Sequence, residues 1–195
     1  MHFPPPSHFS PVVQTQEKAV VFDFSKGYSP DFIASFPFGI GRYNEVRKNM
    51  YLSALYKDER NVHMGVDFWM AAGSAVFSFY DGKILFFRDN NNPGDYGPTI
   101  VTEHILDDEP IYALYGHLSS ESLENLCEGQ SVQKGEKIAD IGTEEENGGW
   151  APHLHFQLSR VKPKKADMPG VVAKNERKRA LQIYPDPQLV LGKLY

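Results

Sequence analysis

The stretch His153-Leu154-His155-Phe156-Gln157-Leu158 decides the fold. Apolar and polar side chains alternate along it, which is the period-2 pattern of a β-strand with one face on a core. The three apolar residues are predicted to face that core, and His153, His155 and Gln157 to share the other face. The two histidine Cα atoms would be about 6.5 to 7 Å apart, so one imidazole can ligate a metal while the other addresses a group bound to it. Taken alone, the motif equally fits a structural pair of surface histidines.

The composition of the whole chain favours the same class of fold. Its 195 residues include 13 Phe, 10 Tyr, 16 Gly and 14 Pro, which favours many short strands joined by tight turns. We therefore expect a mainly β, antiparallel-sheet protein with one or two short helices. One domain is expected, with an N-terminal arm at residues 1–18, a core at 60–160 and a C-terminal extension at 161–195.

Local patterns predict two hairpins and one helix. Residues 75–80 and 83–87 flank Asp81-Gly82, a dipeptide typical of a two-residue hairpin turn. Residues 99–104 and 111–117 read as a second pair of strands, with an acidic turn at 107–109 between them. A serine at 119 or 120 is expected to begin a short helix that ends near Leu126.

Composition and charge exclude several classes of protein. With 41% hydrophobic and 23% charged residues, the chain is not of the disordered type. A single cysteine, Cys127, excludes an internal disulfide and a thiolate cluster, so any metal must be held by histidine and carboxylate. The basic stretch at 160–179 lacks the interleaved aromatic residues of a nucleic-acid surface, so we expect no nucleic-acid partner.

The sequence also predicts no membrane-spanning helix, because no apolar run approaches about 18 residues. The N-terminus has neither a basic nor an apolar signal region. As written, the sequence predicts a cytoplasmic location, or the cell envelope if a signal has been removed.

A second histidine pairs with a carboxylate in His63-Met64-Gly65-Val66-Asp67. Gly65 is expected to let the backbone bend so that both side chains reach one point. Imidazole and carboxylate form a ligand set suited to zinc, and three protein ligands leave a fourth tetrahedral position for water. His63, Asp67 and one of the histidines of the 153–158 stretch would complete the set. By itself, a histidine four residues before an aspartate is more often a capped turn.

The third motif is Tyr115-Gly116-His117-Leu118. Strand parity places His117 on the face of Ile111, Ala113 and Tyr115, at the end of its strand. Alone it would be a structural histidine, as we take His104 to be. Four of the seven histidines fall in the three motifs, and this clustering favours a catalytic site.

Taken together, the ordered set H-M-G-V-D, Y-G-H-L and H-L-H-F resembles the signature of lysostaphin-type (LytM-like) zinc metallopeptidases. The resemblance covers about 100 residues, from 60 to 160, and implies a LytM-like fold of the barrel-sandwich hybrid type. It also implies a Zn²⁺ ion bound by His63, Asp67 and His155, with His117 and His153 as the catalytic histidines.

The activity implied by this resemblance is zinc-dependent hydrolysis of a peptide amide bond, in peptidoglycan or a peptide derived from it. In such a hydrolase His117 or His153 accepts the proton of the attacking water and steadies the oxyanion. The sequence does not assign the two roles. A hydrogen bond from Tyr96 or Tyr115 to the oxyanion is an alternative to a purely structural role for either tyrosine.

Four further segments suggest a finer resemblance: residues 41–47, 95–99, 146–150 and 185–187. They are similar to peptidase-like segments that lie between a kinase-like phosphotransferase and a class III aminotransferase in large fusion proteins. This resemblance implies that the chain belongs to a branch of the peptidase family that is not secreted.

Three alternatives to a peptidoglycan peptidase stay open. A non-haem iron oxygenase uses two histidines and one carboxylate, but leaves His117 and His153 without a purpose. A non-catalytic module would bind a peptide or wall fragment, and would normally lack a ligand residue. A cytoplasmic hydrolase of a small amide metabolite would use the same residues.

Overall fold

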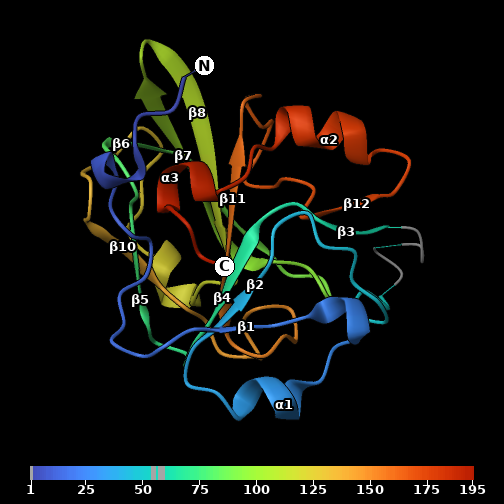
Figure 1. Cartoon of the computed structure of the whole chain (residues 1–195). Helices are drawn as coiled ribbons and strands as arrows, with labels where there is room; N and C mark the ends of the chain where they lie inside the picture. Colours follow the sequence, from blue (N-terminus) through green and yellow to red (C-terminus); the bar gives the residue numbers. More distant parts are fainter. Residues whose placement is uncertain (1, 54–55, 57–59) are drawn as a thin grey trace.

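One large sheet forms the centre of the molecule (Figure 1). The computed structural model describes residues 2–53, 56 and 60–195. The strand order in this sheet is β1-β2-β4-β11-β8-β7-β6-β9, and only β1 and β2 among these described strands are parallel neighbours. The strands are β1 (Val20–Val21), β2 (Gly39–Gly41), β4 (Val66–Trp69), β6 (Gly82–Asn90), β7 (Gly97–Leu106), β8 (Glu109–Gly116), β9 (Ser131–Val132) and β11 (His153–Ser159).

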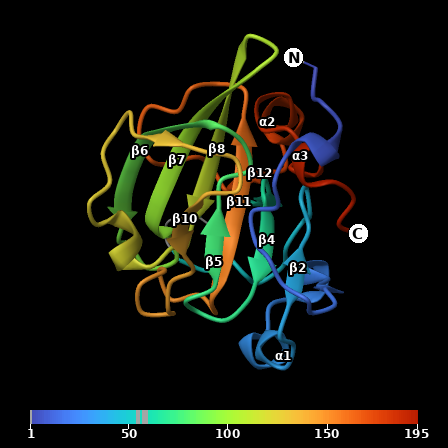
Figure 2. The same ribbon diagram turned by 90° about the vertical axis from the view of Figure 1, so that its left-hand side faces the viewer.

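Two small antiparallel sheets flank the large one. One pairs β5 (Ala75–Phe77) with β10 (Lys137–Asp140), and the other pairs β3 (Arg60–His63) with β12 (Val171–Ala173). Figure 1 shows the first pair on one side of β4 and β11 and the second pair on the opposite side, and Figure 2 shows β5 in front of the large sheet. The described helices are α1 (Pro30–Ala34), α2 (Arg177–Ile183), α3 (Gln188–Leu191) and 3-10 turns at Pro6–His8, Phe24–Lys26 and Ser120–Leu123.

The mainly β, antiparallel class is confirmed, although the described residues contain three short α-helices instead of one or two. None of these helices has the length and apolarity needed to cross a membrane.

Strand β11 carries the core on one face, as its alternation predicts. Leu154, Phe156 and Leu158 are fully buried in the main hydrophobic cluster, which also contains Val76 of β5 and Ala139 of β10. The core therefore lies between the large sheet and the β5–β10 pair. It leaves the histidine face of β11 on the opposite side of the sheet.

The second predicted hairpin is confirmed. Leu106 at the end of β7 pairs with Glu109 at the start of β8. The two residues between them, Asp107 and Asp108, have φ angles of 47° and 62°. Consecutive positive φ values match the right-handed twist of the flanking strands, and aspartate tolerates this conformation better than most residues.

The first predicted hairpin is wrong, because β5 pairs with β10 whereas β6 pairs with β7 and β9. Neither Asp81 nor Gly82 has the positive φ that a two-residue hairpin turn requires. Between the strands, the fully buried Phe79 packs against His104 and Phe156. The chain therefore crosses from the small sheet to the large one through the core.

The predicted helix near Leu126 is also wrong, because only a 3-10 turn forms, at Ser120–Leu123. The Ser119 hydroxyl bonds the hydroxyl of Ser122 instead of capping a backbone N–H. Extended backbone at Glu124 and a φ of 61° at Asn125 then end the turn.

Burial of His104 predicts a specific acid sensitivity. Its Nδ1 contacts the Asp81 carbonyl, its Nε2 contacts the Thr102 hydroxyl, and burial lowers its pKa to about 4. The unfolded chain, with a histidine pKa of about 6.5, binds more protons between these values, so the free energy of unfolding falls as pH falls through this window. In His104→Gln, the decrease in the free energy of unfolding between pH 7 and pH 5 is expected to be about 2 kcal/mol smaller than in the wild type. Urea unfolding at both pH values measures it, and an unchanged pH dependence would contradict the prediction.

Candidate metal centre

Sheet register brings Asp67 and His155 together. Asp67 on β4 is the direct cross-strand partner of His155 on β11, and His63 ends β3 just before the turn into β4. The distances are 2.9 Å from Asp67 Oδ1 to His155 Nδ1, 3.2 Å from Asp67 Oδ1 to His63 Nε2, and 3.1 Å between the two histidine nitrogens. All three residues are almost fully buried.

Hydrogen bonds on the far side of each ring fix which nitrogen carries a proton. His63 Nδ1 lies 2.9 Å from the Arg42 carbonyl oxygen, so this nitrogen donates and Nε2 keeps its lone pair. His155 Nε2 lies 3.0 Å from Gln157 Oε1, whose amide is oriented by donating to the Pro169 carbonyl. His155 Nδ1 therefore also keeps its lone pair.

Three electron-pair donors face one another with no proton between them, an arrangement that a cation stabilises. The three atoms lie 2.9 to 3.2 Å apart. Tetrahedral zinc with ligand bonds of about 2.0 to 2.2 Å separates its ligand atoms by about 3.4 Å, so small adjustments suffice. These residues fit a divalent metal with two imidazoles and one carboxylate.

Burial and neighbouring charges set the protonation states of this cluster. Burial and the charge of Arg47 lower the pKa of His63 to about 4. For Asp67, burial by itself raises the pKa, but His63 and Arg47 outweigh it and hold this pKa well below the ordinary value. Near neutral pH the imidazole of His63 is neutral and the carboxyl of Asp67 is ionised, as metal ligation requires.

The backbone bends at Gly65, as predicted, and the glycine also provides space for His155. The φ of Gly65 is not positive. A Cβ atom at this position would lie 2.6 Å from His155 Cε1 and 2.7 Å from the Phe156 carbonyl oxygen. Such contacts are too short for any side chain, so glycine lets the β3–β4 turn pass directly beside the imidazole.

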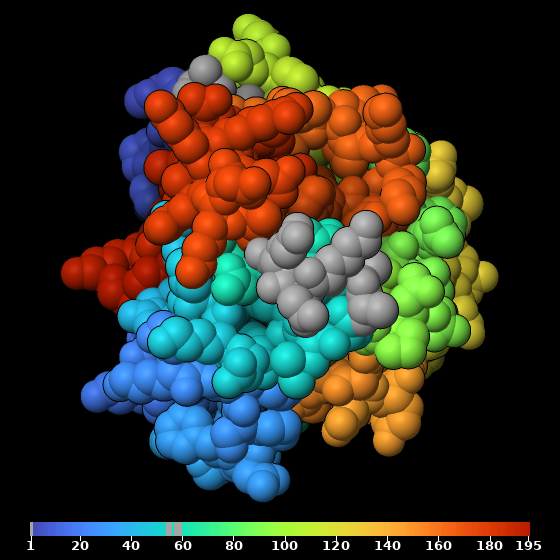
Figure 3. All heavy atoms as spheres, turned by 90° about the vertical axis from the view of Figure 1, so that its right-hand side faces the viewer, coloured from blue at the N-terminus to red at the C-terminus, as the bar shows by residue number. Residues whose placement is uncertain are grey.

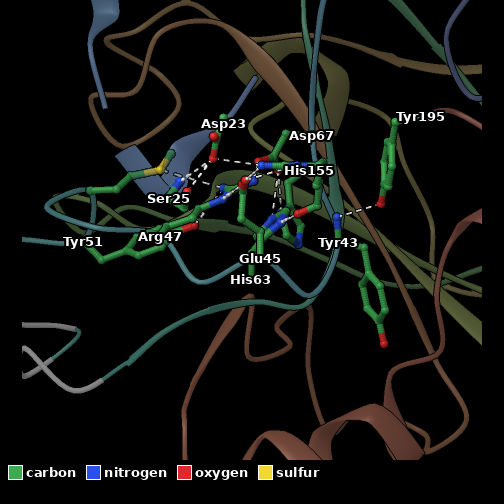
Figure 4. Close-up of polar contacts among 12 residues, drawn as sticks. Asp23, Ser25, Tyr43, Glu45, Arg47, Tyr51, His63, Asp67, His155 and Tyr195 are labelled. Atoms are coloured by element: carbon green, nitrogen blue, oxygen red, sulfur yellow. Dashed lines mark hydrogen bonds and ion pairs between the residues drawn. The ribbon is translucent and has the colours of Figure 1, made fainter. Parts of the chain in front are cut away.

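Arg47 holds the second oxygen of Asp67. Its Nη2 lies 2.7 Å from Asp67 Oδ2, its Nε 3.3 Å from Glu45 Oε2, and its Nη1 2.9 Å from the Tyr51 hydroxyl oxygen. Only 1% of the Arg47 side chain is exposed. Figure 4 shows Arg47, Asp67, His63 and His155 pointing toward one another. The ion pair leaves Asp67 Oδ1 as the oxygen that faces the two histidines.

The ion pairs of Arg47 continue outward to the surface. Arg42 Nη2 lies 2.6 Å from Glu45 Oε1 and 2.9 Å from Asp23 Oδ1. Charges of alternating sign thus lead from half-exposed Asp23 through Arg42, Glu45 and Arg47 to buried Asp67. This arrangement offsets the cost of burying Arg47 and Asp67, because each buried charge has an opposite charge beside it.

His117 and His153 lie side by side next to this cluster. Their ring centroids are 4.1 Å apart. His117 Nδ1 donates to the Asn147 carbonyl at 3.0 Å, and His153 Nδ1 donates to the Ala151 carbonyl at 2.8 Å. Burial lowers the pKa of both, to about 4 for His153. Each therefore presents an unprotonated Nε2 that can accept a proton.

The predicted face of His117 is wrong. Ile111, Ala113 and Tyr115 lie in the main core, whereas the ring of His117 lies beside that of His153 on the opposite side of the sheet. The physical reason is a φ of 63° at His117, which interrupts the strand alternation directly after β8. This left-handed backbone turns the side chain into the site.

All five predicted site residues line one pocket of about 170 Å³. Tyr96 also lines it, but its hydroxyl donates to the Met168 carbonyl at 3.0 Å. The Tyr115 hydroxyl lies in the core, where it accepts from the Phe79 N–H. Neither tyrosine has its hydroxyl directed to the metal cluster. No described residue before Arg47 lines the pocket, so the arm at 2–18 does not line it.

Sequence reasoning missed Arg47 and Tyr51 as members of the site. Both line the pocket, Arg47 fully buried and Tyr51 partly buried, and they lie 20 and 16 residues before Asp67 in the chain. The available signal was a charged Glu45-Val46-Arg47 segment, whose alternation puts Glu45 and Arg47 on one face. Nothing local in that segment indicates which carboxylate the arginine meets.

A metal cluster of two histidines and an aspartate, flanked by two further histidines on an antiparallel sheet, defines a candidate metallohydrolase site. The chain belongs to peptidase family M23, whose sequence model matches residues 61–169. This result confirms the lysostaphin-type resemblance, because the matched region contains all three motifs.

The similarity to individual relatives covers only part of each protein. The chain is 37% identical over 112 residues to peptidoglycan DD-endopeptidase ShyB of Vibrio cholerae, which is 55% of this chain and 24% of that protein. It is 31% identical over 96 residues to ShyA of the same organism, 49% of this chain and 20% of that one. The chain thus spans about a quarter or less of the length of these curated relatives.

Among solved structures, the chain is similar to the catalytic domain of lysostaphin from Staphylococcus simulans. The sequence identity is 27% and the TM-score 0.46, over 73% of this chain and 95% of that domain.

Arg47 is expected to stabilise the site strongly. Arg47→Met leaves the carboxylate of Asp67 buried without its cation, which is expected to cost about 3 to 5 kcal/mol of unfolding free energy. The matched control is Arg42→Met, where the half-exposed ion pairs contribute about 1 kcal/mol or less. Denaturant unfolding with a chelator present measures both losses. Equal losses would show that the buried ion pair has no special role.

Proposed function

We propose that the chain is a zinc-dependent peptidase that hydrolyses an amide bond in peptidoglycan or in a peptide derived from it. The observation that carries this proposal is the convergence of three unprotonated ligand atoms beside two imidazoles with free Nε2 atoms. Membership of peptidase family M23 supports it. The curated relatives ShyB and ShyA, named as peptidoglycan DD-endopeptidases, suggest the substrate.

The proposed zinc ligands are His63 through Nε2, Asp67 through Oδ1 and His155 through Nδ1. Their neutral and anionic forms are the ones that zinc requires. Gln157 and the Arg42 carbonyl orient the two imidazoles from outside, a common arrangement that raises ligand basicity and fixes the ring. Bound zinc would lower the pKa of a coordinated water and polarise the scissile carbonyl.

His117 and His153 are the proposed acid–base residues. Each keeps Nδ1 engaged with a backbone carbonyl, so each can take a proton at Nε2 and then donate it. After accepting a proton, an imidazolium can steady negative charge on the carbonyl oxygen or pass the proton to the leaving amine. Because the two sites are alike, either histidine can act as the base.

Two competing functions are less well supported. A binding module that has lost catalysis would lack at least one ligand or acid–base residue, whereas all five are present and meet in one pocket. An iron oxygenase would use the His63, Asp67 and His155 set but leave the paired His117 and His153 unused. The similarity to segments of kinase-like and aminotransferase fusion proteins stays a prediction, as does the compartment in which the protein acts.

Single substitutions separate metal binding from proton transfer. Asp67→Ala removes a ligand and is expected to reduce zinc content of the purified protein from about one ion to near zero, because ligand loss leaves two imidazoles. His117→Ala is expected to keep zinc but lose about 10²- to 10⁴-fold in turnover of peptidoglycan peptides. Elemental analysis and mass spectrometry of digested peptides measure the two effects.

The outcome that contradicts the assignment is equal zinc loss in both variants. Retained zinc with unaltered turnover in His117→Ala, and also in His153→Ala, would remove both histidines from the reaction. Folding of each variant is checked by thermal unfolding.

A further inference from the structure

Residues 166–170, here called the strap, form the second half of the connection from β11 to β12 and cross the face of the large sheet that carries the metal cluster. We propose that the strap closes the site on one side, so that the substrate is a free peptide or the end of a peptide chain. This inference rests on the proposed peptidase function. It narrows the substrate class, because a chain that continues in both directions from the scissile bond would not fit.

Four of the five backbone carbonyls of the strap accept hydrogen bonds from residues in or next to the sheet strands. The Asn90 side chain donates to the Ala166 carbonyl at 2.8 Å, and the Tyr96 hydroxyl to the Met168 carbonyl at 3.0 Å. Further bonds run from Gln157 Nε2 to the Pro169 carbonyl, at 3.3 Å, and from the Met64 N–H to the Gly170 carbonyl, at 2.8 Å. The donors come from β6, β11 and the loops next to β3 and β7, so the strap spans the sheet.

Apolar packing fills the space beneath the strap. Ala166 and Met168 are 2% and 3% exposed and form a buried cluster with side chains of β7 and β8, namely Val101, Tyr112 and Leu114. These side chains lie on the same face of the sheet as Gln157, which is fully buried. The face that a longer peptide would occupy beyond Gln157 is thus already covered by the protein itself.

No gap separates the strap from the wall of the pocket at Tyr96. A Cβ atom added to Gly170 would overlap the Tyr96 hydroxyl. Immediately after the strap, β12 pairs with β3, and Val171 is opposite His63. Figure 3 shows the orange segment around residues 160–180 lying against the cyan to teal segment that precedes β4 on this side of the molecule.

The size of the pocket agrees with this closure. Its volume of about 170 Å³ is small beside the ~300 to 1,000 Å³ of sites for drug-sized ligands, and the pocket is partly open to solvent. Met168 and Pro169 line it from the strap, and Tyr51 and Trp150 from other walls. The strap thus forms one wall of this small pocket.

The test compares two probes made from the same material. Isolated peptidoglycan sacculi are one probe, and the glycan-free peptides that an amidase releases from these sacculi are the other. With the zinc-loaded protein, the released peptides are expected to be cleaved about 100-fold faster per susceptible bond, the cost of misplacing a reacting group by about an ångström. Mass spectrometry identifies each product and the number of residues on either side of the cut.

Binding without turnover provides a second readout. With a chelator present, the protein is expected to bind the released peptides in calorimetric titration and not to sediment with sacculi. Equal cleavage of both probes, or cuts with several residues on both sides, would overturn the inference and leave the proposed function intact. If neither the sacculi nor the released peptides are cleaved, the proposed function is contradicted, and this inference with it.

Met168→Ala tests the strap directly. Removing this side chain widens the closed side, so cleavage of sacculi relative to released peptides is expected to rise at least about tenfold, which corresponds to about 1.4 kcal/mol in the barrier. Val161→Ala, an exposed residue of the same connection, is the matched control and keeps the wild-type ratio. The wild-type comparison stands even if Met168→Ala does not fold, and an unchanged ratio in a folded variant contradicts the role of the strap.

Discussion

Three atoms that carry lone pairs lie within 3.2 Å of one another in the protein interior. The rest of the site depends on this constraint. Such an arrangement is costly unless a cation is shared among the donors and the remaining charges are paired. Arg47 supplies one such pairing by holding the outer oxygen of Asp67. The Gln157 side chain and the Arg42 carbonyl accept hydrogen bonds from the two imidazoles, and so keep the ring protons on the sides that face away from the cluster.

The surrounding fold provides this geometry through the large sheet. Direct pairing of Asp67 with His155 across β4 and β11 sets one edge of the cluster, and Gly65 lets the β3–β4 turn bring His63 to the third corner. On the opposite face, these strands pack against the main core. The strap then packs on the part of the cluster-bearing face formed by Val101, Tyr112 and Leu114. The metal cluster and the strap are therefore linked through one short stretch of β11, because Gln157 contacts both His155 and Pro169.

The sequence predicted the parts that depend on local chemistry. Alternation in β11 and the aspartates of the β7–β8 turn are set by neighbours in the chain, and both predictions are confirmed. The 75–87 hairpin, the orientation of His117 and the role of Arg47 depend on contacts between distant segments. Burial of Phe79 overrode a favourable turn dipeptide, and one residue with positive φ reversed strand parity. The position of the strap could not be predicted from the sequence either, because the strap is held through its backbone carbonyls, which every residue has.

The most direct measurement is X-ray absorption spectroscopy of the zinc-loaded protein at neutral pH. We expect one zinc ion per chain, with two imidazoles and one carboxylate oxygen as protein ligands at about 2.0 to 2.2 Å, and with no sulfur. A spectrum that requires three or more imidazoles would place His117 or His153 on the metal and contradict the division between ligands and acid–base residues. A chain that binds no zinc would contradict the central claim itself.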